Sequence, residues 1–234
     1  MAASNANRRA PFIVIEGLDR SGKTTQTSKL HSRLKENGVE VSLLKFPDRT
    51  TAIGQMINSY LRSASELDDR AIHLLFSANR WELASAIEKL LLAGTPVICD
   101  RYAFSGIAFS ASKVNSLGDP LLAFDWCRSP DIGLPAPDIV LFFDITPEKA
   151  KERGGYGEER YEKEEMQLRV RQVFHRIGEE MAESWRLSGS GTRWVSVDAG
   201  RGRDDIERDV WALVDPLVRD GVEGPINKLW TNSR

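Results

Sequence analysis

Short apolar runs alternate with longer segments of mixed polarity along most of the chain. The short runs have the length of strands, and they cover residues 12–16, 39–46, 96–100, 138–144 and 193–197. In the longer segments, apolar residues recur every three or four positions, which is the spacing of one helix face. These predicted helices cover residues 24–37, 51–62, 67–92, 103–113, 117–127, 147–153, 162–185 and 203–219.

This alternation predicts an α/β fold in which a parallel sheet is covered by helices on both faces. A chain of 234 residues fits one such domain, and we expect it to span residues 11–234. Residues 1–10 are small and polar, and they lack the apolar stretch of a secretory signal. We expect them to form a disordered tail.

Composition excludes several classes of partner. The net charge of −2 gives no bulk attraction to nucleic acid or to an anionic membrane, so we expect neither partner. No apolar stretch approaches the roughly 18 residues of a membrane span. The two cysteines have no metal-site spacing and are typical of reduced thiols in an intracellular protein. We expect a cytoplasmic location, with the nucleus and the mitochondrion left open as alternatives.

A glycine-rich loop follows the first apolar run directly and precedes the first predicted helix. It has the pattern G-x-x-x-x-G-K-[ST], and it consists of Gly17, Leu18, Asp19, Arg20, Ser21, Gly22, Lys23 and Thr24. Glycines let the backbone curl so that its N–H groups point at an anion, and the helix N-terminus attracts negative charge. The lysine reaches the β- and γ-phosphates, and the threonine hydroxyl can bind Mg²⁺. The loop therefore predicts binding of a nucleoside triphosphate.

Two more loops follow predicted strands, and each carries an arginine. Arg49 comes after the second strand, and Asp100 and Arg101 come at the end of the third. Ligands of open α/β sheets bind at the carboxyl ends of the strands. A carboxylate there can hold Mg²⁺ through water, and an arginine can bind a phosphate. A structural ion pair explains Asp100 and Arg101 equally well. The phosphate-binding loop and these two loops are expected to converge at the strand ends, and this arrangement favours phosphoryl transfer to a small phosphorylated acceptor.

Two other features have ordinary explanations as well as functional ones. Phe76 and Arg80 lie four residues apart on one helix face, where they could stack on a nucleobase and hydrogen-bond its edge. Spacing alone fits a core phenylalanine and a solvated arginine better. Three glycines within residues 154–157 suggest a mobile lid at about 153–161, although an ordinary surface loop fits equally well.

Taken together, these motifs resemble thymidylate kinase of the eukaryotic type. The resemblance runs in order through residues 17–24, 46–49, 75–82, 100–106 and 159–162. It implies a P-loop nucleoside monophosphate kinase fold with a five-stranded parallel sheet and a small lid. It also implies ATP-dependent phosphorylation of dTMP to dTDP with Mg²⁺, by a homodimer, in dTTP synthesis for DNA replication.

The resemblance implies a role for each matching residue. The catalytic residues would be Arg20, Lys23 and Arg101. The ATP site would comprise Gly17, Asp19, Arg20, Ser21, Gly22, Lys23, Thr24, Thr25 and Arg153. The dTMP site would comprise Asp19, Phe46, Arg49, Phe76, Arg80, Arg101, Ser105, Gly106, Phe109, Glu159 and Tyr161. Mg²⁺ would be held by Thr24 and Asp100.

Within that dTMP site, the family assigns particular contacts. Arg49 and Arg101 would grip the phosphate. Phe76 would stack on thymine, and Arg80 would donate to its O4 atom. Ser105, Gly106 and Phe109 would line the thymine pocket. Asp19 would meet the sugar 3′-hydroxyl, and Tyr161 would exclude a 2′-hydroxyl.

Family members take their catalytic arginine either from the phosphate-binding loop or from the lid. The resemblance favours Arg20 in the loop here, and it puts Arg153 near the ATP base or phosphates. A phosphate monoester has a second pKa of about 6, so the acceptor needs no general base at neutral pH. We accordingly expect His31, His73 and His175 to be structural or solvated.

Three other functions remain as alternatives. A P-loop kinase of another small metabolite would lack a use for Phe76, Arg80 and Tyr161. A regulatory GTP-binding module would need an Asn-Lys-x-Asp motif, which the sequence does not contain. An inactive nucleotide binder would not need Arg20, Lys23, Asp100 and Arg101 together.

Overall fold

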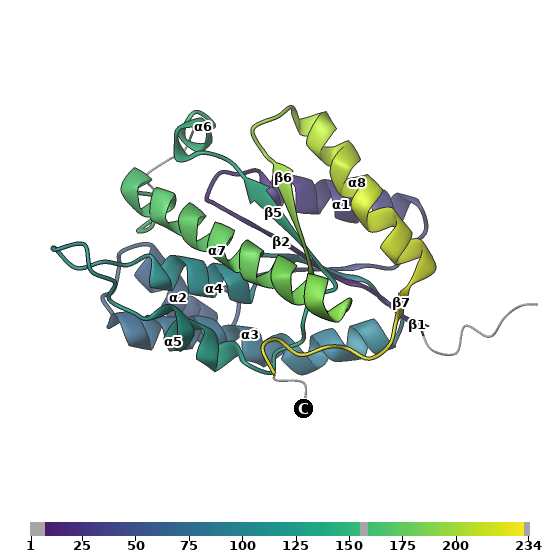
Figure 1. Ribbon diagram of the computed structural model, residues 1–234, viewed down its shortest axis with the longest axis horizontal. Coiled ribbons are helices and arrows are strands. Elements are labelled where there is room, and N and C mark those ends of the chain that lie inside the picture. Colours follow the sequence, from purple (N-terminus) through teal and green to yellow (C-terminus); the bar gives the residue numbers. More distant parts are fainter. Residues whose placement is uncertain (1–7, 155–158, 232–234) are drawn as a thin grey trace, which may run out of the picture.

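The computed structural model describes residues 8–154 and 159–231, and a parallel sheet forms its centre (Figure 1). The sheet has five strands in the order β3-β4-β2-β5-β6, all parallel. This confirms the predicted fold class. The strands are β2 (Phe12–Gly17), β3 (Ser42–Lys45), β4 (Val97–Asp100), β5 (Ile139–Asp144) and β6 (Arg193–Asp198).

Helices cover both faces of this sheet (Figure 1). Helices α1 and α8 contact each other on one face, and α4 and α7 pack together on the other with α3 beside α4. The helices are α1 (Lys23–Glu36), α2 (Ala52–Leu61), α3 (Asp69–Leu92), α4 (Ala103–Ala111), α5 (Phe124–Arg128), α6 (Pro147–Lys151), α7 (Glu164–Ser188) and α8 (Arg203–Asp220), with a 3₁₀ turn, η1, at Ser129–Asp131. Within the described residues, none of these helices has the length and apolar content needed to cross a bilayer.

The core follows from the continuous apolar runs in the central strands. All residues of β2 and β4 are buried, as are Ile139–Phe143 of β5. Strands that carry apolar side chains on both faces need cover on both sides, which the two helix layers supply. Burying these runs fixes the sheet, and the sheet then fixes where each strand ends.

Local signals explain where several helices begin. The Thr51 side chain accepts a hydrogen bond of 3.0 Å from the Gly54 backbone and caps α2. The Asp68 side chain caps α3 through the backbone N–H of Arg70, at 2.8 Å. Such caps replace the intrahelical partners that the first N–H groups lack. Gly38, with φ of +79°, follows the end of α1.

The expected disordered tail is too long. Residues 1–7 lie outside the described residues, but Arg8–Arg9 form strand β1, which pairs antiparallel with β7 (Val222–Glu223). Arg9 is buried and forms two hydrogen bonds, of 2.8 and 2.7 Å, with the Asp138 carboxylate. This ion pair ties the segment to the start of β5, so the folded chain begins before residue 11.

The predicted helix at 117–127 is also wrong over most of its length. Only Phe124–Arg128 is helical. The Asn115 side chain accepts hydrogen bonds from the backbones of Leu117 and Asp119, at 2.8 and 2.9 Å. Such local bonds compete with a helix, and Gly118 has φ of +89°. The apolar spacing there marks a turn instead.

Candidate active site

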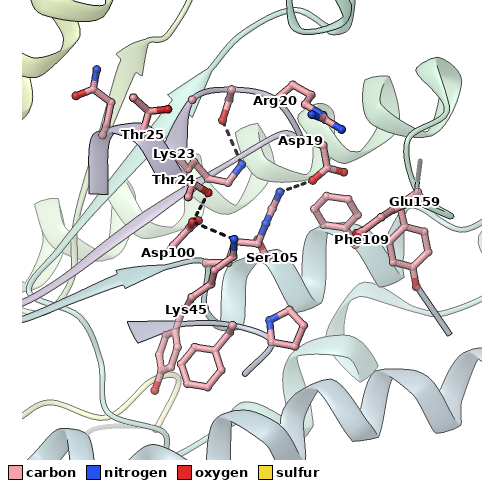
Figure 2. A pocket seen from close by; sticks show the side chains of 18 of the residues that line it. Asp19, Arg20, Lys23, Thr24, Thr25, Lys45, Asp100, Ser105, Phe109 and Glu159 are labelled. Atoms are coloured by element: carbon pink, nitrogen blue, oxygen red, sulfur yellow. Dashed lines mark hydrogen bonds and ion pairs between the residues drawn. The ribbon is translucent and has the colours of Figure 1, made fainter. Parts of the chain in front are cut away.

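A cavity of about 750 Å³ opens at the carboxyl ends of the sheet strands (Figure 2). Its walls come from the phosphate-binding loop, the β3–α2 and β4–α4 connections, α3 and α4, and the segment that leads into α8. All three loops that the sequence predicted to converge contribute to it. The residues of the predicted dTMP site from Phe46 to Tyr161 also line it, so it joins both predicted sites.

The phosphate-binding loop adopts a backbone that requires its glycines. Gly17 has φ of +148°, and a Cβ atom there would lie 2.6 Å from the Phe143 carbonyl oxygen. Gly22 has φ of +93° at the start of α1. L-residues with side chains rarely adopt such angles. The loop therefore presents backbone N–H groups and the α1 N-terminus to the cavity, as an anion site needs.

Lys23 is buried under this loop. Its ammonium donates to the Leu18 carbonyl and to Ser21 Oγ, the latter at 3.2 Å. Burial and, next, repulsion from Arg101 lower the Lys23 pKa to about 7, against the opposing attraction of nearby carboxylates. A bound phosphate group would supply the missing negative charge.

An oxygen-rich pair lies beside the lysine. Thr24 Oγ1 donates a hydrogen bond of 2.7 Å to Asp100 Oδ2 (Figure 2). Lys45 Nζ lies 3.9 Å from the same carboxylate oxygen. A hydroxyl and a carboxylate are hard oxygen ligands of the kind Mg²⁺ prefers. These two side chains therefore fit a magnesium site at the edge of the loop.

Arg101 connects the phosphate-binding loop to α4. Its guanidinium donates to the Gly17 carbonyl at 2.9 Å, to Ser105 Oγ at 3.0 Å and to Asp19 Oδ1 at 2.5 Å. Its own φ is +69°, an unusual angle for a residue with a side chain. Glu16 lies behind it and is fully buried. The Glu16 carboxylate accepts from the backbones of Tyr102 and Ser105, at 2.9 and 3.0 Å, and burial raises its pKa.

Two more arginines of the cavity contact carboxylates of the 159–162 segment. Arg49 Nη2 lies 2.8 Å from Glu159 Oε1, and Arg20 Nε lies 3.2 Å from Glu162 Oε1. These ion pairs join the phosphate-binding loop and the β3–α2 loop to the downstream end of the predicted lid. Residues 155–158 of the predicted lid lie outside the described residues.

Phe76 and Arg80 both line the cavity, so this helix face is exposed to whatever ligand the cavity holds. Arg80 is not solvated, because its guanidinium is buried and forks onto Asp131 with hydrogen bonds of 3.1 and 2.6 Å. Gly106 packs against that guanidinium, and a Cβ atom there would lie 2.7 Å from Arg80 Nη2. The Phe109 ring lies 5.2 Å below the Arg101 guanidinium.

Tyr161 is buried between aromatic rings. Its ring centroid lies 5.5 Å from that of Phe109 and 6.1 Å from that of Tyr60, and its hydroxyl donates to the Tyr60 hydroxyl at 3.4 Å. The Lys113 ammonium lies 5.2 Å from the Tyr161 ring centroid. Tyr161 is therefore held rigidly at the edge of the cavity.

Arg153 lies against the phosphate-binding loop, at the end of the cavity near α8. It donates to the Arg20 carbonyl at 3.2 Å and to the Ala199 carbonyl. Burial and the nearby Arg203 lower the pKa of its guanidinium. Positive charge thus gathers at this end of the cavity.

Comparisons with known proteins identify the family of this chain. A family model described as thymidylate kinase matches residues 15–210. The thymidylate kinase of Arabidopsis thaliana is 45% identical and aligns with 98% of this chain and 80% of its own length. The human thymidylate kinase is 40% identical, with 96% of this chain and 99% of the human protein covered. The chain belongs to the thymidylate kinase family.

The solved structure of the thymidylate kinase from Candida albicans supports the same conclusion. It superposes with a TM-score of 0.80 at 38% sequence identity, and it covers 95% of this chain and 99% of its own. The chain is therefore a nucleoside monophosphate kinase with the P-loop fold. As a thymidylate kinase, it uses ATP to phosphorylate dTMP to dTDP in dTTP synthesis.

Several residues of this thymidylate kinase site were missed from the sequence. Asp131 fixes Arg80, Glu16 fixes the start of α4, and Gln167 holds Asp19 through a hydrogen bond of 2.8 Å. Glu16 had a usable signal, because it is a charged residue at the end of an apolar strand. Asp131 and Gln167 had none, since each meets its partner only after the chain has folded.

Proposed function

We propose that the cavity divides into a donor half for ATP and an acceptor half for dTMP. The observation that carries this proposal is the continuity of one cavity from the phosphate-binding loop to Phe76 and Arg80. The donor half comprises Asp19, Arg20, Ser21, Gly22, Lys23, Thr24, Thr25 and Arg153, together with Gly17, which shapes the loop without lining the cavity. The acceptor half comprises Asp19, Phe46, Arg49, Phe76, Arg80, Arg101, Ser105, Gly106, Phe109, Glu159 and Tyr161.

In this arrangement, positive charge performs the catalysis. The acceptor phosphate is already mostly dianionic at neutral pH, because its second pKa is about 6. It therefore attacks without a general base. Repulsion between the two anions and the charge that spreads over the transferred group are offset by Lys23, Arg20 and Arg101. Arg20 has a φ of +63° within the loop, which supports a role fixed by the backbone.

We also propose that Thr24 and Asp100 hold Mg²⁺, Thr24 directly and Asp100 through water. The 2.7 Å hydrogen bond between these side chains brings two suitable oxygens together at the loop. The metal would neutralise charge on the ATP phosphates. Thr24 projects from α1 and Asp100 from the end of β4.

In the acceptor half, Arg49 and Arg101 bind the dTMP phosphate, and Asp19 accepts from the sugar 3′-hydroxyl. Phe76 stacks on the thymine ring and Arg80 donates to O4. Tyr161 closes the space that a 2′-hydroxyl would need. The rigid packing of Tyr161 against Phe109 and Tyr60 supports that last role.

The protein acts as a homodimer in this proposal. Leu74 and Trp81 are exposed apolar side chains on α3. Ile132 is exposed in the neighbouring loop, where the Pro130 carbonyl accepts a hydrogen bond of 2.8 Å from Trp81 Nε1. Such a patch is unfavourable in water and suits a second copy of the chain. We propose a cytosolic location, which the unpaired thiols of Cys99 and Cys127 support. Light scattering and a fluorescent fusion test these two statements.

Turnover with ATP, Mg²⁺ and a panel of dTMP, dUMP, dCMP, UMP and AMP tests the acceptor half. We expect fast turnover of dTMP, slower turnover of dUMP, and little with the others. One methyl group in an apolar pocket contributes only about 1–3 kcal/mol, so dUMP remains a substrate. If UMP were turned over as fast as dUMP, Tyr161 would not exclude a 2′-hydroxyl.

Arg20→Ala tests the catalytic arginine. An arginine in this role is worth about 10³ to 10⁵ in rate in phosphoryl-transfer enzymes, so we expect kcat to fall by about that much while the KM for dTMP changes little. Arg153→Ala is the matched control, and it should act on ATP affinity instead. An unchanged kcat in Arg20→Ala would disprove the assignment.

A further inference from the structure

Lys113 is a charged side chain that is buried behind the cavity and takes no part in the proposed reaction. It follows helix α4, its side chain is only 8% exposed, and it does not line the cavity. Its ammonium forms an ion pair of 2.6 Å with Asp69, the first residue of α3, and it donates to the Tyr60 hydroxyl near the end of α2 at 3.1 Å. A buried charge costs stability unless it is paired and hydrogen-bonded, so these partners determine where the ammonium lies.

The same ammonium also lies over two aromatic rings. It is 5.3 Å from the centroid of the Tyr60 ring and 5.2 Å from that of the Tyr161 ring. The Arg160 guanidinium lies 4.1 Å from the Tyr60 centroid. A cation is attracted to the face of an aromatic ring, most strongly where water is excluded. Two cations therefore hold Tyr60, and one of them, Lys113, also holds Tyr161.

The backbone beside Tyr161 is fixed to the end of α2. The Arg160 N–H group donates to the Leu61 carbonyl at 3.0 Å, and the Arg160 side chain donates to the Tyr60 carbonyl at 2.9 Å. Segments from α2, from α3 and from the end of α4 thus meet around one ring of the cavity wall. Because both the backbone and the ring of Tyr161 are held, neither can move without breaking contacts with the other segments.

These contacts direct the Tyr161 hydroxyl away from a ligand. This hydroxyl donates to the Tyr60 hydroxyl at 3.4 Å, and Tyr60 does not line the cavity, whereas Tyr161 does. Burial raises the pKa of Tyr161 well above its usual range, so its hydroxyl keeps its proton at neutral pH. A ligand therefore meets the ring carbons of Tyr161. A hydroxyl group placed against them loses its hydrogen bonds to water and gains none in return.

We propose that Lys113 is a positioning residue that determines sugar specificity: by holding the Tyr161 ring in place, it makes the site accept a deoxyribose and reject a ribose. Tyr60 and Asp69 support the lysine in this role. The inference rests on the proposed function of Tyr161 beside the sugar. A ring that could tilt would make room for a 2′-hydroxyl or turn its own hydroxyl toward it, and the anchored ring does neither.

The test compares dTMP with 5-methyl-UMP, the thymine ribonucleotide that differs from dTMP only by its 2′-hydroxyl. Lys113→Met keeps an unbranched side chain and removes the charge. We expect the kcat/KM for dTMP divided by that for 5-methyl-UMP to fall about tenfold, as for one lost buried cation–π contact. The kcat with saturating dTMP should stay within about threefold, because Lys113 does not touch the transferred group.

Two further variants separate this anchoring from packing. Tyr60→Phe keeps the ring and removes the oxygen to which Lys113 and Tyr161 both donate, so we expect the ratio to fall about threefold or more. In the double variant Lys113→Met/Tyr161→Ala, the ratio should equal that of Tyr161→Ala, because the lysine has no ring left to hold. Thermal unfolding and ATP affinity identify variants that fail to fold. If Lys113→Met fails, Tyr60→Phe, which removes a single oxygen, still decides.

Arg9→Met is the matched control. It also breaks a buried ion pair, but its partner Asp138 directly precedes β5, at the edge of the sheet opposite the cavity. Its thermal stability should therefore fall, while its ratio should equal that of the unmodified protein. A ratio that fell equally in Arg9→Met and Lys113→Met would show that lost stability alone relaxes the site, and the inference would be wrong.

An unchanged ratio in folded Lys113→Met, or in Tyr60→Phe where that variant decides, would overturn the inference. Tyr161→Ala distinguishes this failure from a failure of the proposed sugar site. If Tyr161→Ala loses discrimination and Lys113→Met retains it, only the role of Lys113 is wrong. If Tyr161→Ala also retains it, the sugar does not meet Tyr161, and both proposals fail.

Discussion

Lys23 enters the reaction cycle from an unusual starting point, because burial lowers its pKa to about 7 in the free protein. At pH 8 most of the free protein therefore carries a neutral Lys23. Bound phosphates raise the pKa again, since they favour the charged ammonium. We expect ATP binding at pH 8 to take up nearly one proton per site. At pH 6 the lysine is already charged and should take up almost no proton, whereas the γ-phosphate, about half protonated there, should release protons on binding.

Isothermal titration calorimetry in buffers of different ionisation enthalpy measures this uptake. The γ-phosphate of ATP itself is fully ionised at pH 8, because its last pKa is near 6, as for other phosphates, so the proton must bind the protein. Lys23→Arg is the control, because its guanidinium stays charged and should take up none. Binding heats at pH 8 that do not depend on the buffer would contradict the prediction.

In the proposed acceptor half, Asp131 acts on the base through Arg80. We expect Asp131→Asn to raise the KM for dTMP by about tenfold or more while the KM for ATP stays unchanged. The amide replaces one acceptor with a donor, so the guanidinium loses its fixed direction and remains buried without a full partner. Removing one member of a buried ion pair costs about 3–5 kcal/mol of stability, which thermal unfolding should detect.

Asp125→Asn is a control for this variant. It breaks the ion pair between Arg128 and Asp125, and the Asp125 side chain is 77% exposed. Exposed pairs contribute about 0–1 kcal/mol, so we expect no measurable change in either KM. If Asp131→Asn left the KM for dTMP unchanged, Arg80 would not need its carboxylate.

The predictability of these residues depends on how locally each one acts. The glycines and Lys23 were found from the sequence because a phosphate is bound by consecutive backbone groups, and that requirement fixes their spacing. Arg80 was a candidate from its spacing to Phe76, but only the family resemblance favoured it over a solvated arginine. Its partner Asp131 lies 51 positions away, and no local pattern connects two such residues before the chain folds.

At the scale of elements, the C-terminal segment supports the loop that carries Asp131. Backbone hydrogen bonds of 3.0, 2.9 and 2.8 Å join residues 133, 134 and 136 to residues 229 and 227. Leu229 is buried, and the Trp230 ring lies 5.7 Å from that of Phe104. We expect deletion of residues 226–234 to destabilise the protein and to raise the KM for dTMP about tenfold, with little effect on ATP.

Chemical denaturation and steady-state kinetics check this deletion. Burying one leucine side chain alone contributes about 2 kcal/mol, so a loss of at least that size is expected. Lys228→Ala is the control within the same segment, since it removes only a half-exposed ion pair with Glu88. A truncated protein with full stability and an unchanged KM for dTMP would show that the 129–136 loop does not need residues 226–234 to keep its conformation.

The elements differ in how well the sequence predicts them. Strands with continuous apolar runs, such as Ile139–Asp144, were located to within a residue because burial on both faces leaves little choice. The two-residue pairing of β1 with β7 depends on Arg9 reaching Asp138 and has no pattern of its own. The predicted helix at 117–127 failed because Asn115 supplies local hydrogen bonds that the periodicity does not reveal.

At the scale of the whole molecule, the two helix layers correspond to the two halves proposed for the cavity. The donor side meets α1 and the start of α8, whereas the base wall is formed by α3 and α4 on the other face (Figure 1). The sheet between them is the rigid part, so the loops at its edge hold fixed positions relative to one another. The layered fold followed from the alternation of strands and helices, and the meeting of both halves in one cavity followed from the parallel strands.

The free energy of unfolding should depend on pH through His73. Its pKa is lowered from 6.5 to about 4 in the folded protein. Between those values the unfolded chain binds a proton that the folded protein does not, so stability falls as the pH falls from about 6.5 to 4. A shift of this size corresponds to about 3 kcal/mol.

Urea titrations of the unmodified protein and of His73→Gln test this dependence. Between pH 7 and pH 4, the loss in the free energy of unfolding should be smaller by about that amount for His73→Gln than for the unmodified protein. Glu16, whose raised pKa acts in the opposite direction, is common to both proteins and cancels in the comparison. Parallel pH profiles for the two proteins would mean that His73 titrates normally in the folded protein and that burial does not disfavour its charged form.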